Sequence, residues 1–123
     1  MIQLPETILF DSGLAKLKPQ GEVALEKIAK HLKSHPAAIV RIDGHTDNDP
    51  IVKSKYLWKS NHHLSAGRAL SVFHYLVNKA HIDEKRLHIA AYGPNSPIAS
   101  NKTKAGKAKN RRVEFLILSP KSG

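Results

Sequence analysis

Apolar residues recur at helical spacing in two segments of this chain. In the first segment they follow the pattern i, i+3, i+4, i+7, which gathers them on one face of a helix. They are Leu25, Ile28, Ala29 and Leu32. Pro19 suits the first turn of such a helix and Pro36 stops it, so the pattern predicts an amphipathic helix over about 19–34.

The second helical segment follows a polar pair, Ser60 and Asn61, either of which can cap a helix. Its apolar residues keep the helical period and predict a helix over about 62–79 with that face buried. They are Ala66, Ala69, Leu70, Phe73, Leu76, Val77 and Ala80. The preceding stretch, 45–60, contains turn-forming residues and is predicted to be a long loop.

Further short segments have the character of β-strands. Residues 7–10 are apolar and precede a turn-like sequence, and residues 39–43 are rich in β-branched side chains. Apolar and other residues alternate over 87–93 and 112–117, as expected of strands with one buried face. The polar, basic stretch 102–111 has room for a short helix.

The predicted order is strand, helix, strand, helix, strand, strand. Helices of this length between strands act as crossovers, which make the joined strands parallel neighbours. We therefore predict one α+β domain over 1–123, with its core at about 7–118. It should contain a mixed β-sheet with two long helices packed on one face.

The charge balance narrows the classes of partner. Lysine and arginine number 20 against 10 acidic residues, a net charge of +10, which favours polyanions such as nucleic acid, acidic lipid or an acidic cell-wall polymer. A solvated basic surface without a specific anion is the plainer interpretation. Aromatic residues are only 6% of the chain, so a base-stacking platform for nucleic acid is poorly supported.

Catalytic and metal-binding patterns are missing from the sequence. It has no HExxH or GxSxG motif and no phosphate-binding glycine loop, so we do not expect an enzyme. Cysteine is absent, which excludes disulfides and thiolate metal sites. His31 and His35 are four residues apart, but no third ligand is evident nearby, so neither a metal nor a cofactor is expected.

A candidate binding pair lies where the second strand ends and the second helix begins. Asp47 follows the strand directly, and Asn61, Ser65 and Arg68 share one helix face, which we expect to lie away from the buried stripe. A carboxylate binds an ammonium and a guanidinium binds a carboxylate, so Asp47 and Arg68 suit a zwitterionic amino-acid head group. The alternative is a structural Asp47–Arg68 salt bridge. Arg111 and Arg112 add anion donors, or form an ordinary basic turn.

Several motifs occur in the order typical of one family. They are Leu9-Phe10-Asp11-Ser12-Gly13, Ile42-Asp43-Gly44-His45-Thr46-Asp47, Asn61-His62-His63-Leu64-Ser65-Ala66-Gly67-Arg68-Ala69, Tyr92-Gly93, Pro97-Ile98, Asn101 and Asn110-Arg111-Arg112-Val113-Glu114. On these motifs nearly the whole chain resembles the OmpA-like peptidoglycan-binding domain. The insert at 49–60 is most similar to the periplasmic part of flagellar stator B subunits (MotB type).

The resemblance implies non-catalytic binding of peptidoglycan through the diaminopimelate of its peptide stem. It implies that Asp47 holds the ammonium and Arg68 a carboxylate, while Asn61, Leu64, Arg111 and Arg112 line or support the pocket. Departures from the family pattern are Gly67, where alanine is frequent, and Lys107, where arginine is common.

The same resemblance implies a periplasmic anchor for a motor stator or another membrane protein. It would be attached to the inner or outer membrane through segments upstream of this chain, and stator subunits work in pairs, so a homodimer is expected. No nucleic acid is expected as partner. The alternative function is a basic module that binds nucleic acid or another polyanion.

Overall fold

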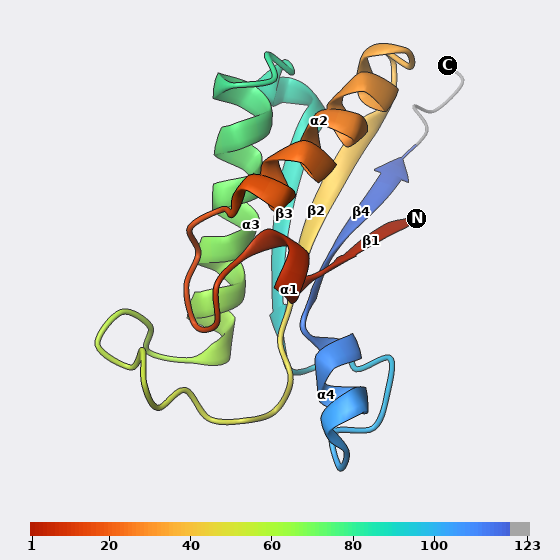
Figure 1. Ribbon diagram of the computed structural model, residues 1–123. Coiled ribbons are helices and arrows are strands. Elements are labelled where there is room, and N and C mark those ends of the chain that lie inside the picture. Colours follow the sequence, from red (N-terminus) through yellow and green to blue (C-terminus); the bar gives the residue numbers. More distant parts are fainter. Residues whose placement is uncertain (119–123) are drawn as a thin grey trace.

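The strands of this protein form one mixed sheet in the order β1-β4-β2-β3 (Figure 1). The computed structural model describes residues 1–118. β2 and β3 are parallel, and β4 runs antiparallel to both β1 and β2. The strands are β1 (Ile2–Pro5), β2 (Ile39–His45), β3 (Leu87–Gly93) and β4 (Arg112–Leu118).

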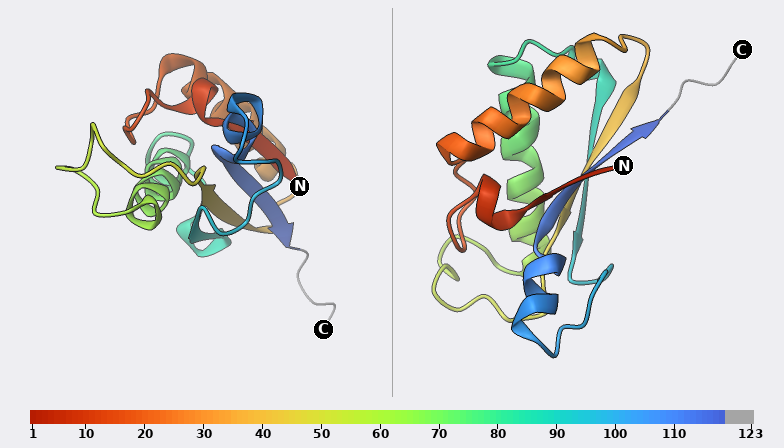
Figure 2. Two further views of the ribbon diagram at one scale, coloured as in Figure 1. Left: turned by 90° about the horizontal axis from the view of Figure 1, so that it is seen from below. Right: turned by 45° about the vertical axis from the view of Figure 1, so that its right-hand side comes forward.

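Two long helices, α2 (Pro19–Lys33) and α3 (Asn61–Asn78), cover one face of the sheet (Figure 2). The short helices are α1 (Glu6–Leu9), η1 (Glu84–Arg86) and α4 (Lys104–Asn110). The opposite face of the sheet carries no helix of the described chain (Figure 2). The predicted α+β fold, with a mixed sheet and both long helices on one face, is therefore confirmed, and both helix predictions agree with the structure within one residue.

The residues of the hydrophobic core recur at the spacing expected of each strand and helix. Alternate residues of β2 and β4, Val40, Ile42, Val113 and Phe115, point toward the helices and are almost completely buried. They pack against the apolar stripes of α2 and α3, and burying each such side chain stabilises the fold by roughly 1.5–3 kcal/mol. The members of this cluster on α2 and α3 are Leu25, Ile28, Ala29, Leu32, Ala69, Val72 and Leu76.

α3 approaches the sheet most closely at Gly44 of β2. A Cβ atom at this position would lie 2.3 Å from the carbonyl oxygen of Ser65, so the contact requires a residue without a side chain. The Ser65 hydroxyl also accepts a hydrogen bond from the backbone N–H of Gly93, at 3.2 Å. These contacts fix the start of α3 against the ends of β2 and β3, beside the loop that carries Asp47.

The first predicted strand is wrong in position. Residues 7–10 lie in and directly after the single helical turn α1, while the strand lies earlier, at Ile2–Pro5. Leu9 and Phe10 are neighbours and both are buried, at 0% and 2% exposure. A strand with only one buried face cannot bury two consecutive side chains, whereas the end of a helical turn can.

The structure describes a short helix, α4, within the basic stretch at 102–111. Thr103 caps it by accepting a hydrogen bond from the N–H of Gly106 at 2.9 Å. α4, α1 and the loop after β2 gather at one end of the sheet (Figure 1). No helix in the described part of the chain is both long and apolar enough to cross a bilayer.

Candidate ligand-binding site

Asp47 lies in the loop that follows β2, at the end of the sheet nearest α4. Its Oδ1 accepts a hydrogen bond from the backbone N–H of Asp49 at 2.9 Å, which turns the loop sharply. Its Oδ2 pairs with Nη1 of Arg111 at 2.6 Å. Asp47 is 6% exposed, so this carboxylate is mostly enclosed but lies beside a partly open guanidinium.

Arg111, between α4 and β4, bridges two carboxylates. Besides Asp47 it binds Glu6, with Nε 2.7 Å from Oε2. Burial alone would lower the pKa of Arg111, but hydrogen bonds and charges from Asp47 and Glu6 outweigh it and raise the pKa. Its side chain is 31% exposed, so Arg111 is the guanidinium of this site that a ligand can reach from solvent.

Arg68, in contrast, is 3% exposed and fully engaged with the N-terminal part of the chain. Its Nη2 pairs with Oε1 of Glu6 at 2.7 Å, and its Nε donates to the carbonyl of Leu14 at 2.8 Å. Its guanidinium also lies over the ring of Phe10, 5.0 Å from the centroid. We predicted this helix face to lie away from the buried stripe, and that is wrong for both Arg68 and Ser65.

The four side chains Arg68, Glu6, Arg111 and Asp47 form an uninterrupted row of alternating charges, here called the charge row. Within residues 1–118, Asp47 pairs with Arg111 and Arg68 pairs with Glu6. The direct Asp47–Arg68 salt bridge considered from the sequence therefore does not form. The two residues belong to one network, but Glu6 and Arg111 lie between them.

The other predicted site residues are divided between two places. Asn61 donates from Nδ2 to the carbonyl of Asp49 at 2.9 Å, which ties the Asp47 loop to the first turn of α3. Leu64, one turn along, is 6% exposed. Arg112 points to the helix-free face of the sheet, where it binds Glu114 and the carbonyl of Ser96. It therefore does not join the charge row.

Glu6 is the member of the charge row that sequence reasoning missed. It belongs to no motif and follows Pro5, directly ahead of the strand predicted at 7–10. Its partners Arg68 and Arg111 lie far away in the chain, on α3 and just before β4, so only the folded structure brings the three together. Its one local signal is a carboxylate at the start of a helical turn.

The insert at 49–60 is anchored to α3 by Trp58. The indole N–H donates to the carbonyl of Gly13 at 2.9 Å, and the ring lies over Gly67. A Cβ atom at position 67 would be 2.6 Å from Cη2 of Trp58. The departure from alanine at this position thus makes room for the indole. Tyr56, two residues before Trp58 in the same loop, is 79% exposed.

Taken together, the helix-covered mixed sheet and the charge row define a small α+β domain with a polar site at one end of its sheet. Residues 9–111 match the OmpA family. The chain belongs to the OmpA family.

The chain is similar in sequence and structure to motility proteins. It is 40% identical to Motility protein B of Bacillus subtilis over 118 residues, which cover 96% of this chain and 44% of that protein. The periplasmic domain of Helicobacter pylori MotB superposes with a TM-score of 0.87 at 29% identity, covering 96% of this chain and 81% of that one. The cell wall anchor of the T6SS from Pseudomonas aeruginosa gives 0.83 at 29% identity, covering 96% and 80%. The chain spans about half the length, or less, of the curated relatives it matches.

Proposed function

We propose that this domain binds peptidoglycan without cleaving it and anchors a larger protein to the cell wall. Its membership of the OmpA family supports this, as does its likeness to a cell wall anchor and to MotB periplasmic domains. The observation that carries the proposal is the charge row, because its outer end presents a carboxylate and a partly exposed guanidinium side by side. Such a pair matches the ammonium and carboxylate of an amino-acid head group.

The proposed ligand is the diaminopimelate of the peptide stem, and Asp47 is assigned to its ammonium. An ionised carboxylate has about four lone-pair positions. The described contacts of Asp47 use two of them, from Arg111 and from the N–H of Asp49. The remaining positions can accept from an ammonium that approaches along the loop, where Asn61 and Leu64 of α3 flank the site.

The ligand carboxylate is assigned to the two guanidinium groups, Arg111 and Arg68. Glu6 lies between them, 2.7 Å from each, and so occupies the place that a ligand carboxylate would take. An incoming carboxylate meets Arg111 first, because the Arg68 side chain is only 4% exposed. Contact with Arg68 then requires the ligand to replace Glu6, and Arg112 supports the site from behind through the start of β4.

Binding of soluble stem peptides tests this assignment. We expect Asp47→Asn and Arg111→Ala each to weaken binding of a diaminopimelate stem by about 10- to 100-fold, as loss of one charge-assisted contact does. The matched controls are Glu22→Gln and Lys33→Ala on α2, which change the same charges far from the site. Equal binding of diaminopimelate and lysine stems by the wild type would contradict the assignment of the guanidinium groups, because lysine lacks the second carboxylate.

A basic module for nucleic acid or another polyanion is the second candidate, favoured by the net charge of +10. Competition separates the two: an excess of stem peptide should release the domain from purified sacculi, while a DNA oligomer should not. Release by DNA alone would favour the second candidate. Appearance of soluble fragments from the sacculi would contradict binding without cleavage.

We further propose that the domain works in the periplasm, attached to the inner or outer membrane through other segments of a longer protein. A homodimer is proposed on the likeness to MotB domains. Light scattering at rising protein concentration tests the dimer, and a constant monomer mass for the longer protein would contradict it.

A further inference from the structure

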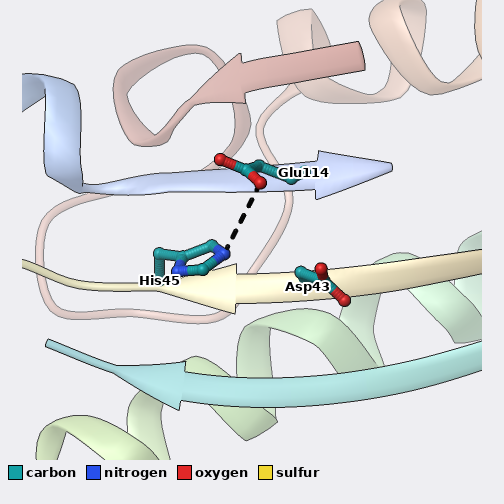
Figure 3. Close-up of side chains that lie close together, drawn as sticks. All are labelled: Asp43, His45 and Glu114. Atoms are coloured by element: carbon teal, nitrogen blue, oxygen red, sulfur yellow. Dashed lines mark ion pairs between the residues drawn. The ribbon is translucent and has the colours of Figure 1, made fainter. Parts of the chain in front are cut away.

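The helix-free face of the sheet carries a cluster of three potential metal ligands. Asp43 and His45 project from β2 and Glu114 from β4, all toward the same side (Figure 3). Asp43 lies directly opposite Glu114 in the sheet register, and His45 is two residues further along β2. One ligand atom from each residue lies within 4.8 Å of the others. This cluster is separate from the charge row.

His45 is the unusual member of the cluster. The residue is 5% exposed, yet neither ring nitrogen has a hydrogen-bond partner among the described residues. Its Nε2 lies 3.8 Å from Oε1 of Glu114, which is too long for a hydrogen bond. Tyr92 stacks on the ring with centroids 4.8 Å apart and holds its plane. A buried polar group without a partner is rare in native proteins and requires an explanation.

An imidazole ligates a metal ion through the lone pair of one ring nitrogen, and neither nitrogen of His45 is engaged elsewhere among the described residues.

The two carboxylates lie close together, and each is paired with one arginine, Asp43 with Arg41 and Glu114 with Arg112. Directly opposed like charges destabilise a sheet. Glu114 receives Arg112 and Gln3 on Oε2, so its Oε1 is left facing His45. Asp43 is held by Arg41, with contacts of 2.7 and 3.0 Å. The Arg41 side chain is 34% exposed, so it can move into solvent and release Asp43.

We propose that Asp43, His45 and Glu114 bind a divalent transition-metal ion of the zinc type. One imidazole nitrogen and two carboxylate oxygens form a donor set that zinc accepts, with water as a fourth ligand, whereas magnesium and calcium prefer oxygen alone. Tetrahedral zinc with bonds of about 2.0 Å places its ligand atoms roughly 3.3 Å apart. The His45–Glu114 separation of 3.8 Å is close to that value, and the side chain of Asp43 supplies the remaining movement.

The ion would enter from solvent through a shallow cavity on this face. The cavity measures about 370 Å³, and its lining includes the three ligands together with Arg41, Tyr92 and Arg112. Binding would give His45 its missing partner and separate the opposed carboxylates by a cation. Arg41 and the metal ion would compete for the carboxylate of Asp43. Arg112 would keep its contact with Oε2 of Glu114, the oxygen that faces away from His45.

Calorimetry with ZnCl₂ on the whole chain tests the proposal. One zinc per chain is expected, with MgCl₂ giving no binding under the same conditions. His45→Gln should weaken zinc binding by at least about 100-fold, since changes even to residues behind a metal ligand cost about 10- to 100-fold. Because His45 is buried, folding of this variant is checked by circular dichroism.

Arg41→Gln provides a second test on a partly exposed side chain. It removes the competitor for Asp43, so we expect zinc to bind about tenfold more tightly, whereas a purely structural cluster would show no change. The control is the double variant His31→Gln/His35→Gln, whose rings lie 4.6 Å apart at the C-terminal end of α2 and form the obvious adventitious zinc site. The proposal is overturned if the control abolishes zinc binding, if Arg41→Gln has no effect on it, or if the wild type binds no zinc.

Discussion

Arg68 lies at the enclosed end of the charge row, so its mutation should lower the stability of the fold. Arg68 is enclosed and binds Glu6 together with the carbonyl of Leu14. Arg68→Ala removes one partner of a buried ion pair, so we expect a loss of about 3 kcal/mol in the free energy of unfolding. Urea denaturation measures this loss.

Arg111→Ala is the comparison for that measurement. The Arg111 side chain is 31% exposed, and its removal leaves Arg68 on Glu6, so we expect it to cost clearly less stability than Arg68→Ala. Equal stability of the wild type and Arg68→Ala would contradict the buried role described for Arg68.

Gly67 and Trp58 allow a prediction with a specific optical signal, because Trp58 is the single tryptophan of the chain. Gly67→Ala places a methyl group 2.6 Å from the indole, so we expect Trp58 to leave α3 and its fluorescence to shift to the red. The stability should change little, because alanine favours the helix by about 1 kcal/mol over glycine and offsets part of the lost packing. An unchanged emission spectrum would contradict this account of the insert.

At the scale of the elements, a solvent-exposed hydrogen bond joins the two long helices α2 and α3. The hydroxyl of Tyr75 on α3 donates to Oε1 of Glu26 on α2 at 2.6 Å. That bond, followed by burial and the charge of Glu26, raises the pKa of Tyr75 to about 12. Tyrosine in the unfolded chain has a pKa of about 10, so the Tyr75–Glu26 bond contributes fully to the stability of the fold below that pH. This contribution is lost as the pH rises from about 10 to the folded-state pKa of about 12.

Ultraviolet titration of the tyrosines measures this effect. Tyr75 should ionise near pH 12, and Glu26→Gln should bring its pKa back toward the ordinary range of a tyrosine. Tyr75→Phe, the matched control, should remove the late step altogether. A late step that persists in Tyr75→Phe would contradict the assignment.

The helices were predictable from the sequence alone, whereas most contacts between elements were not. α2 and α3 were predictable because their apolar period is long and their caps are local. Asp47 and Arg111 were identified as site candidates, but their pairing was not, because it depends on how α4 leads into β4. The ion pairs of Glu6 and the cluster of Asp43, His45 and Glu114 could not be predicted, since contacts between residues far apart in the chain leave no local pattern in the sequence.

At the scale of the whole molecule, the net charge of +10 predicts two kinds of binding with different salt dependence. Non-specific attachment through scattered lysines, to DNA or to the polyanions of sacculi, should weaken steeply between about 50 and 200 mM salt. Binding of a soluble stem peptide at Asp47 should change much less, because few ions are displaced by one small ligand. Sedimentation and calorimetry over the same salt series measure the two, and parallel slopes would contradict a specific site.

The position of Glu6 has a mechanical consequence. Glu6 directly follows β1, the edge strand, which is held to β4 by the pairs from Ile2 with Phe115 to Pro5 with Arg112. Tension on chain ahead of β1 would peel this short strand and withdraw Glu6 from between Arg68 and Arg111. Because Glu6 occupies the place proposed for the ligand carboxylate, its withdrawal leaves both guanidinium groups to the ligand. Pulling single molecules from the N-terminus should therefore lengthen the lifetime of a bound stem peptide relative to pulling from β4, and an equal or shorter lifetime would contradict this. A domain built in this way would hold its ligand more firmly under load.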